Sequence, residues 1–203
     1  VFLSHPHADH IGGVTELINT FPIDTIYHSG SSYESDLFYS YRAAAEDHHI
    51  PVKTLKAGQW LMPDAATRLF VYGPSKHLSA SSPSDVNNRS LVLELVYGTT
   101  EFLFMGDAEG AQEQRLLESY PRLLETDVLK VAHHGSRSSS TDRFLRASRP
   151  ATGIVSLGLH NHFGHPHESA VRRLRNYIES VYFTSLYGAV QLKSDGHRIR
   201  VIR

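Results

Sequence analysis

Residues 4–13 read Ser4-His5-Pro6-His7-Ala8-Asp9-His10-Ile11-Gly12-Gly13, and this stretch near the N-terminus decides the fold. It follows a short apolar run typical of a strand, and its glycines allow a tight turn into a helix. Imidazole and carboxylate groups are ligands for zinc, manganese and iron. His5 and His7 can point toward one ion, and Asp9 with His10 toward a second position nearby. The stretch therefore predicts a dinuclear metal site, whereas an isolated His-x-His would indicate only a histidine-rich surface loop.

Composition limits the alternatives. A chain of 203 residues with 40% hydrophobic content can bury one sizeable core, so we expect a single domain over residues 1–203. It has no cysteine, which leaves His, Asp, Glu and weaker oxygen donors as metal ligands. Neither a signal peptide nor an apolar run near the ~20 residues that span a bilayer is present. Because the first strand ends by Ser4 and the first residue is not Met, we expect a fragment of a longer protein.

Charge is distributed unevenly along the chain. Residues 1–128 contain 8 Lys and Arg against 17 Asp and Glu, and residues 129–203 contain 12 against 4. The net charges are thus −9 and +8. A basic C-terminal third could face a polyanion while the acidic part holds cations, although a surface asymmetry without function remains an alternative.

Periodicity predicts mixed helices and strands. Helices are expected at 13–20, 37–49, 109–119 and 169–180, and strands at 23–27, 52–55, 59–62, 67–72, 91–97, 101–105, 128–132, 152–157, 181–184, 188–192 and 199–202. A Ser- and Pro-rich loop is expected at 73–85. The motifs that carry chemistry follow the predicted strands.

Further candidate ligands come from the second half of the chain. Asp107 ends a strand beside a glycine, and a carboxylate that bridges two ions is a better interpretation than a helix N-cap. His133 and His134 also end a strand, where neighbouring side chains point to opposite faces, so at most one of them is expected to reach a given site directly. A polar turn with one buried histidine is the alternative there. His165 lies between Gly164 and Pro166, a rigid position for a ligand, and the remaining candidates in that loop are His160, His162 and His167.

Several of these stretches together resemble one family. They are 4–13, Asn87-Asn88-Arg89-Ser90, Phe104-Met105-Gly106-Asp107-Ala108-Glu109, Leu129-Lys130-Val131-Ala132-His133-His134-Gly135-Ser136, Asn161-His162-Phe163-Gly164-His165-Pro166 and 184–190. In this order they are similar to the C-terminal metallo-β-lactamase-like domain of ComEC/Rec2-type DNA-internalisation (competence) proteins. The resemblance implies an α/β class, the αβ/βα sandwich of the metallo-β-lactamase fold.

Two departures from that family pattern matter. The superfamily usually begins with further strands that carry an Asp-x-Gly turn, so the fold is expected to be N-terminally truncated here. The usual third histidine of the first metal position is absent, and Asn87-Asn88 occupies its region. Either an asparagine oxygen or His133 completes the position, or it binds weakly and favours an ion such as manganese.

The resemblance implies a metal-dependent nuclease with two divalent ions, Zn or Mn. The expected metal ligands are His5, His7, Asp9, His10, Asp107 and His165; the expected catalytic residues are Asp9, His133 and His134; the expected substrate contacts are Asn88, Ser90, Gly135, Ser136 and Arg137. Arg143, Arg146 and Arg149 could follow a phosphate backbone.

The implied partners are DNA, bound without sequence specificity, and the membrane channel domain of a parent protein. By resemblance this is an extracytoplasmic domain of a bacterial inner-membrane protein of the DNA-uptake machinery, with a free-standing cytoplasmic hydrolase as the alternative. Two other functions remain open. One is a hydrolase of small phosphodiesters, lactones or thioesters on the same site, and the other is a non-catalytic DNA-binding module.

Overall fold

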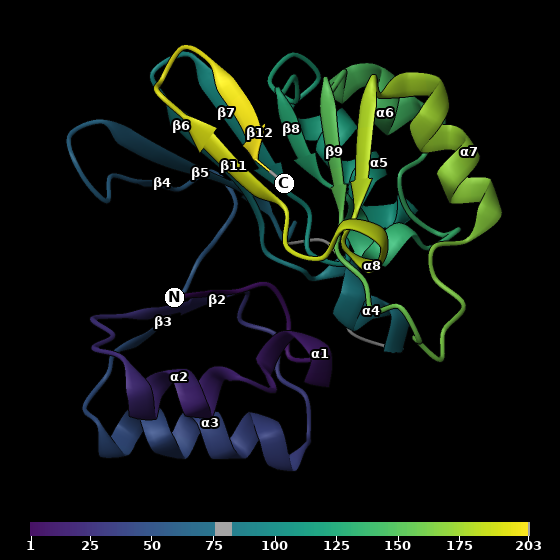
Figure 1. Cartoon of the computed structure of the whole chain (residues 1–203). Coiled ribbons are helices and arrows are strands. Elements are labelled where there is room, and N and C mark those ends of the chain that lie inside the picture. The colour runs from purple at the N-terminus through teal and green to yellow at the C-terminus, as the bar shows by residue number, and fades with distance from the viewer. Residues whose placement is uncertain (76–82, 203) are drawn as a thin grey trace.

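Two β-sheets packed between outer helices form the molecule, which we describe from a computed structural model that covers residues 1–75 and 83–202 (Figure 1). The smaller sheet is parallel, in the order β1-β2-β3. Its layer contains β1 (Phe2–Leu3), α1 (Ala8–Ile11), α2 (Val14–Thr20), β2 (Ile26–His28), α3 (Asp36–Asp47) and β3 (Val52–Thr54). α2 and α3 cover the outer face of this sheet (Figure 1).

The larger sheet has the strand order β4-β5-β6-β7-β8-β9-β10. Strands β4 to β7 pair antiparallel, and β7 to β10 pair parallel. The strands are β4 (Trp60–Leu61), β5 (Thr67–Gly73), β6 (Val92–Tyr97), β7 (Thr100–Phe104), β8 (Val128–Lys130), β9 (Thr152–Val155) and β10 (Ser180–Phe183). The helices of this part are α4 (Pro83–Asn88), α5 (Gly110–Ser119), the 3₁₀ helix η1 (Ala132–Gly135), α6 (Asp142–Ser148), α7 (Glu168–Tyr177) and α8 (Thr184–Tyr187), and a hairpin of β11 (Gln191–Ser194) and β12 (Ile199–Ile202) ends it.

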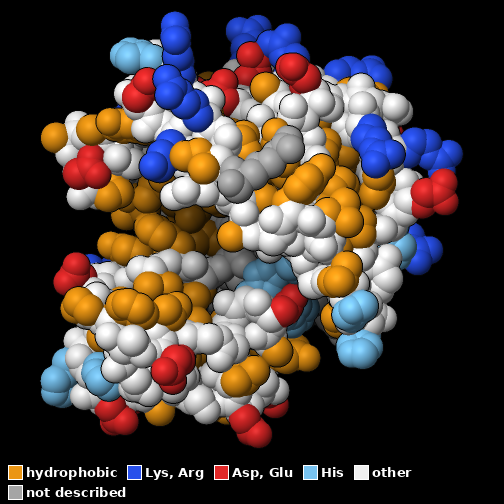
Figure 2. Space-filling view, in the orientation of Figure 1, with side chains coloured by type: hydrophobic (Ala, Val, Ile, Leu, Met, Phe, Trp, Pro, Cys, Tyr) orange, Lys and Arg blue, Asp and Glu red, His pale blue; other side chains and the backbone are white. Residues whose placement is uncertain are grey.

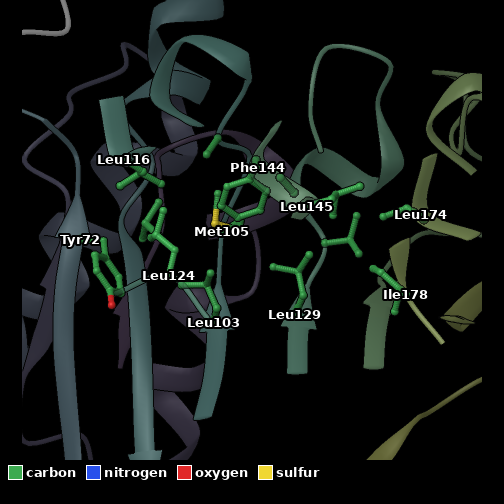
Figure 3. Packing of buried hydrophobic residues seen from close by; sticks show 14 of the residues in the cluster. Tyr72, Leu103, Met105, Leu116, Leu124, Leu129, Phe144, Leu145, Leu174 and Ile178 are labelled. Carbon is green, nitrogen blue, oxygen red and sulfur yellow. The ribbon is translucent and has the colours of Figure 1, made fainter. Parts of the chain in front are cut away.

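The main hydrophobic core lies between the larger sheet and helices α5, α6 and α7 (Figure 3). Leu103 and Leu129 point from the sheet toward Phe144 of α6 and Leu174 of α7, and all four are fully buried. A second core fills the N-terminal layer between its sheet and its helices. A small third cluster that includes Leu55 and Leu93 joins the two sheets. Burial of apolar area on both sides of each sheet holds the layers together.

The predicted α/β sandwich is confirmed, with most helices and strands close to their predicted bounds. The short helices α1, α4, α6 and α8 were absent from the sequence prediction. α4 begins within the loop expected at 73–85, of which residues 76–82 lie outside the described part of the chain. The strand expected at 128–132 ends at Lys130, and the next residues turn into η1.

The carboxyl ends of β7, β8 and β9 lie at one edge of the larger sheet, because these strands run parallel. The end of β1 reaches the same edge, where the Leu91 N–H donates to the Ser4 carbonyl oxygen over 2.7 Å. Gly106, with φ +54°, makes this approach possible, since a Cβ there would lie 2.9 Å from the Cβ of Ser4. The edge thus gathers the loops that carry the candidate ligands.

Candidate metal centre

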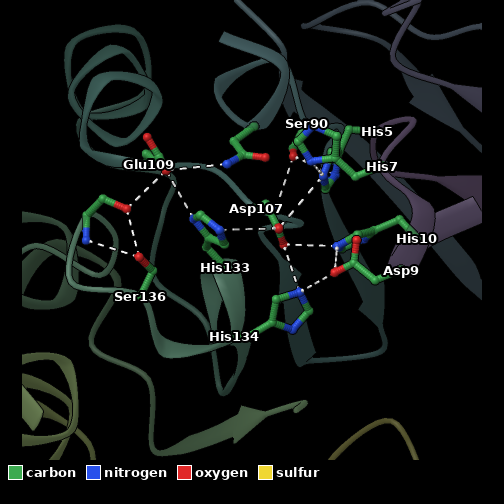
Figure 4. Close-up of polar contacts among 12 residues, drawn as sticks. His5, His7, Asp9, His10, Ser90, Asp107, Glu109, His133, His134 and Ser136 are labelled. Carbon is green, nitrogen blue, oxygen red and sulfur yellow. Dashed lines mark hydrogen bonds and ion pairs between the residues drawn. The ribbon is translucent and has the colours of Figure 1, made fainter. Parts of the chain in front are cut away.

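A single buried carboxylate, that of Asp107, lies at the middle of the centre, and each of its oxygens faces two imidazole rings (Figure 4). Oδ1 lies 3.2 Å from Nε2 of His10 and 3.6 Å from Nε2 of His134. Oδ2 lies 3.7 Å from Nε2 of His5 and 3.8 Å from Nε2 of His133. The arrangement therefore defines two positions, one at each oxygen of the same carboxylate.

The position at Oδ1 also includes Asp9. Its Oδ2 lies 3.5 Å from Nε2 of His10 and 3.2 Å from Nε2 of His134. One ligand atom from each of Asp9, His10, Asp107 and His134 lies within 4.8 Å of all the others. In a tetrahedral zinc site with bonds of 2.0–2.1 Å, neighbouring ligand atoms are about 3.4 Å apart. These side chains thus have the type and spacing of a cation site.

Unpaired polar atoms support this interpretation. Among the described residues, His10 Nε2, His134 Nε2 and Asp107 Oδ1 are buried and form no hydrogen bond although they face one another. Nδ1 of His134 donates to the Ser156 carbonyl oxygen over 2.6 Å, so Nε2 of the neutral ring carries the lone pair. A lone pair directed at carboxylate oxygens is unfavourable unless a proton or metal cation lies between them. The residues therefore fit a divalent cation.

The position at Oδ2 is built on His5 and His7. Nε2 of His5 lies 3.0 Å from Nδ1 of His7, and Nδ1 of His5 lies 3.2 Å from the Ser4 hydroxyl and 3.3 Å from the Ser90 hydroxyl. Burial lowers the pKa of His5 to about 3, and burial also lowers the pKa of His7. Both rings are consequently neutral at pH 7, the form that binds a metal ion.

The carboxylates of the centre are ionised at neutral pH. The neighbouring His134 ring lowers the pKa of Asp9 to about 2. Burial alone would raise the pKa of Asp107, but the contact with His10 and the nearby rings of His5 and His134 bring it below its usual range. The same contact with Asp9 raises the pKa of His134. The centre therefore presents carboxylate anions to whatever occupies it.

Both histidines of η1 reach the centre, which corrects the expectation that at most one could. The residues do not continue the strand: His133 (φ 45°, ψ 46°) and His134 (φ 52°, ψ 25°) adopt left-handed backbone conformations. Such conformations cost roughly 1–2 kcal/mol per residue for a side chain with a Cβ, and strain of this kind concentrates at functional sites. The His133 N–H donates to the Gly106 carbonyl oxygen over 3.1 Å and so ties η1 to the loop that carries Asp107.

His165, the expected ligand beside Asp9 and His10, lies farther out, and His134 takes that place. The ring of His165 packs against that of His133 with centroids 5.3 Å apart. Asn161 holds its backbone, since the amide of Asn161 accepts from the His165 N–H and donates to the His165 carbonyl oxygen. His165 thus lies against the centre but outside the group of mutually close ligand atoms. Of the other loop candidates, the ring of His167 contacts Arg137.

Ser90 and Asn88, expected to contact substrate, are buried and support the centre instead. The Ser90 hydroxyl accepts from the Asp107 N–H over 3.0 Å. The Asn88 side-chain oxygen accepts from the N–H groups of Glu109 and Gln112 at the start of α5. Both residues therefore fix the loop after β7.

The other expected substrate contacts differ in exposure. Gly135 and Ser136 are buried, and the Ser136 N–H donates to the His133 carbonyl oxygen. Arg137 is exposed, and its guanidinium lies 2.9 Å from Nε2 of His167. Of these three, Arg137 alone has a side chain at the open surface next to the centre.

Of the arginines expected to follow a phosphate backbone, Arg143 donates to the Gln114 side chain of α5, and Arg146 and Arg149 lie away from the centre. Arg146 donates to the Tyr177 hydroxyl, and Arg149 pairs with Glu125, just before β8 begins. That is the end of β8 opposite to the histidines. In Figure 2, Lys and Arg side chains gather over the upper and right parts of the face shown, whereas one group of histidines lies in the hollow near its centre.

A cleft of about 550 Å³ opens beside the centre, between β1 and the sheet face of β6 and β7. Its walls are mainly apolar, which Figure 2 shows as hydrophobic side chains in the hollow. Lys130 lies on its floor, where burial lowers its pKa, and its ammonium donates to the Val131 carbonyl oxygen. The lining includes Phe2, Asp9, His10, Leu93, Leu95, Phe104, Lys130 and His134.

Glu109 is a polar residue of the centre for which no role was predicted from the sequence. Its Oε1 lies 3.1 Å from Nδ1 of His133 and accepts from the Ser138 hydroxyl over 3.0 Å (Figure 4). Burial would raise the pKa of Glu109, but His133, Ser138 and Asn87 lower it below the ordinary value. The only signal in the sequence is its place two residues after Asp107, within the stretch Gly106-Asp107-Ala108-Glu109.

Comparison with known families gives the class of protein. The sequence profile of the Metallo-beta-lactamase superfamily matches residues 1–160, and the chain belongs to this superfamily. The fold and the His/Asp donor set together indicate a metal-dependent hydrolase. Solved structures that share the fold include the metallo-beta-lactamase fold protein YhfI from Bacillus subtilis (TM-score 0.55, 14% identity, 99% of this chain and 76% of that one) and CmlA, a diiron β-hydroxylase from Streptomyces venezuelae (TM-score 0.58, 11% identity, 100% and 44%).

Within the superfamily, the chain is similar to competence proteins. ComE operon protein 3 of Bacillus subtilis (strain 168) is 28% identical over 193 residues, and competence protein ComA of Neisseria gonorrhoeae is 31% identical over 189. Recombination protein 2 of Haemophilus influenzae is 28% identical over 207 residues. The match covers 95% of this chain and 24% of ComE operon protein 3, 93% of this chain and 24% of ComA, and 99% of this chain and 23% of recombination protein 2. They confirm the resemblance to the ComEC/Rec2 type, and the chain spans about a quarter of the length of these curated relatives. Among the described residues, no helix is long and apolar enough to cross a membrane.

Proposed function

We propose that this chain is a metal-dependent phosphodiesterase that cleaves DNA, with two divalent cations, Zn or Mn, on the two sides of Asp107. The observation that carries the proposal is the single buried carboxylate with a separate pair of imidazoles at each oxygen. A bridging carboxylate reduces the repulsion between two dications. Similarity to a recombination protein and to competence proteins supports DNA as the substrate.

Two cations bound there would neutralise charge on a phosphate and lower the pKa of a bound water toward about 7. Asp9 is ionised and its side chain is about half exposed, so it can orient a water or accept its proton. Arg137, on the exposed loop after η1, can pair with a phosphate oxygen. Such contacts carry no sequence information, which suits an enzyme that acts on any DNA.

The relatives are about four times as long as this chain, and we propose that it is one domain of a bacterial membrane protein of DNA uptake. On this proposal the domain lies on the extracytoplasmic face, beside a membrane channel domain, and hydrolyses the DNA strand that is not imported. Arg137 and the metal centre would face that strand.

The test is cleavage of end-labelled single- and double-stranded DNA with Mn²⁺, with Zn²⁺ and with EDTA. We expect cleavage only with metal, and Asp107→Ala should abolish it because both positions lose their shared ligand. Asp142→Ala is the matched control, since Asp142 lies exposed in the first turn of α6 and should leave the rate unchanged. Cleavage at the full rate by Asp107→Ala would contradict the two-ion site.

The cleft next to the centre favours a second candidate, a hydrolase of small phosphodiesters, lactones or thioesters, because its apolar walls suit a small apolar group. The two candidates differ in their response to salt. Binding of oligonucleotides should weaken steeply between 50 and 200 mM salt for a nuclease, whereas turnover of a small substrate should change little. Oligonucleotide binding that is independent of metal, without cleavage by any ion, would indicate a non-catalytic DNA-binding module.

A further inference from the structure

Glu109 forms a fixed anchor for one ring of the centre. Its carboxylate accepts from the Ser138 hydroxyl over 3.0 Å and from the Asn87 amide over 3.4 Å, and its side chain is 16% exposed. Its own N–H is held by the Asn88 side-chain oxygen at the start of α5. The oxygen Oε1 that receives these contacts also faces Nδ1 of His133 at 3.1 Å. The position of this carboxylate is thus set by groups other than His133.

This anchor decides which nitrogen of His133 carries the proton. Oε1 of Glu109 acts as an acceptor toward Ser138 and Asn87, and it faces Nδ1 of His133, which is buried and has no other hydrogen-bond partner among the described residues. An acceptor at this position favours a proton on Nδ1, and the lone pair of the neutral ring is then on Nε2. Nε2 points at Oδ2 of Asp107 from 3.8 Å, and Nε2 of His5 points at the same oxygen from 3.7 Å. Lone pairs that converge on a carboxylate oxygen need a cation between them.

An asparagine oxygen is the other candidate to complete this position, and the contacts of Asn88 argue against that residue. The Asn88 oxygen is engaged with the N–H groups of Glu109 and Gln112. The Asn87 amide nitrogen donates to Glu109 over 3.4 Å, whereas its oxygen is buried and has no hydrogen-bond partner among the described residues, so Asn87 remains to be tested. His133 is held in a left-handed backbone conformation that aims its ring at Asp107.

We infer that Glu109 is a positioning residue that fixes His133 in the Nδ1–H tautomer, and that Nε2 of His133 is the third imidazole ligand of the first metal position, with His5 and His7. This inference rests on the proposed two-ion site. A carboxylate that accepts from the second nitrogen of a metal-binding histidine sets its tautomer and orientation, and its loss typically costs 10–100-fold in metal affinity. Three imidazoles and one carboxylate also make this position suited to zinc.

The test compares Glu109→Gln, His133→Ala and the wild type by two measurements. In the metal-free protein at pH 8, the ¹⁵N shifts of the His133 ring should show the Nδ1–H tautomer in the wild type and a mixture in Glu109→Gln. In titrations with Co²⁺ and Zn²⁺, followed by the Co²⁺ spectrum and by metal analysis, the wild type should bind two ions. Glu109→Gln should bind the first-position ion about 10–100-fold more weakly, and His133→Ala should retain one ion.

Asn87→Ala serves as the control for the asparagine alternative and should still bind two ions. An Nε2–H tautomer in the wild type, or two ions bound by His133→Ala with wild-type affinity, would overturn the inference; so would loss of an ion in Asn87→Ala alone. Near-ultraviolet circular dichroism of each variant checks the fold. Because none of these readouts needs DNA, an absence of DNA cleavage would count against the proposed function and leave the assignment of His133 intact.

Discussion

Replacement of Ser90 by alanine tests whether this hydroxyl supports the metal centre or contacts substrate. Ser90 is fully buried, its oxygen accepts from the Asp107 N–H over 3.0 Å, and it lies 3.3 Å from Nδ1 of His5. In Ser90→Ala the buried N–H loses this acceptor, and an unsatisfied buried donor costs about 1–3 kcal/mol. For a loss of about 2 kcal/mol, a chain of this size should show a melting temperature lower by roughly 4–8 °C.

The same variant should also weaken metal binding. Asp107 and His5 both lose a contact that fixes their orientation, and such losses typically reduce metal affinity 10–100-fold. Zn²⁺ affinity is measured by competition with a chromophoric chelator, and stability by thermal denaturation in EDTA. Ser148→Ala is a matched control, because this serine is also fully buried, but its hydroxyl donates to the Phe144 carbonyl oxygen within α6, away from the centre. It should lose about 1 kcal/mol of stability and bind metal as the wild type does.

The two roles for Ser90 predict opposite results. If its hydroxyl contacted substrate, Ser90→Ala would raise KM and leave metal affinity and stability unchanged. That outcome would refute the reasoning from burial and hydrogen bonding. If Ser90→Ala and Ser148→Ala changed metal affinity by the same amount, the reasoning would also be refuted, because the effect would then not depend on contact with the centre.

Two further predictions follow from buried ionisable groups. Burial lowers the pKa of His5 to about 3, so between pH 6.5 and 3 the unfolded chain binds a proton that the folded metal-free protein does not bind. The free energy of unfolding therefore decreases as pH decreases, by up to about 1.4 kcal/mol per pH unit. Urea unfolding at pH 7, 6 and 5 should show a shallower pH dependence for His5→Asn than for the wild type, and equal slopes would contradict this. His134, whose pKa is raised, contributes stability at low pH that is lost as pH rises through that pKa. Glu113→Ala removes a buried carboxylate that accepts from the N–H groups of Ser140 and Thr141. We expect the free energy of unfolding to fall by about 3 kcal/mol and hydrogen exchange at both amides to become faster. An unchanged urea midpoint would show that these contacts contribute little to stability.

The sequence predicted the elements that follow a clear period and the ligands that are close together in the chain. The stretch from His5 to His10 and the place of Asp107 at a strand end were readable because local pattern alone defines them. α6 was missed because it has only seven residues and few of them are apolar. Thr141, whose hydroxyl accepts from the Phe144 N–H, was the available N-cap signal for this helix.

The supporting contacts could not be predicted, because they join loops far apart in the chain. Ser90 and His5 are 85 residues apart, and Glu109 and His133 are 24 apart. The left-handed conformations of His133 and His134 could not be predicted either, because only a few per cent of residues other than glycine adopt such a backbone. A period-2 strand pattern instead places the two rings on opposite faces. Tertiary contacts of this kind decided that His134 rather than His165 lies beside Asp9.

The charge of the centre links metal loading to substrate binding. Asp9, Asp107 and Glu109 have lowered pKa values and are ionised at pH 7, while His5 and His7 are neutral. These three carboxylates together carry a charge of about −3, which repels a phosphodiester anion. Two divalent cations beside them change this sum to about +1, and a pair of unit charges 4 Å apart interacts by about 4 kcal/mol near a protein surface. Arg146 and Arg149 lie away from the centre, which leaves Arg137 as the exposed arginine on the loop next to it. On the proposed function, we therefore expect a phosphodiester to bind at this centre far more weakly without metal than with it.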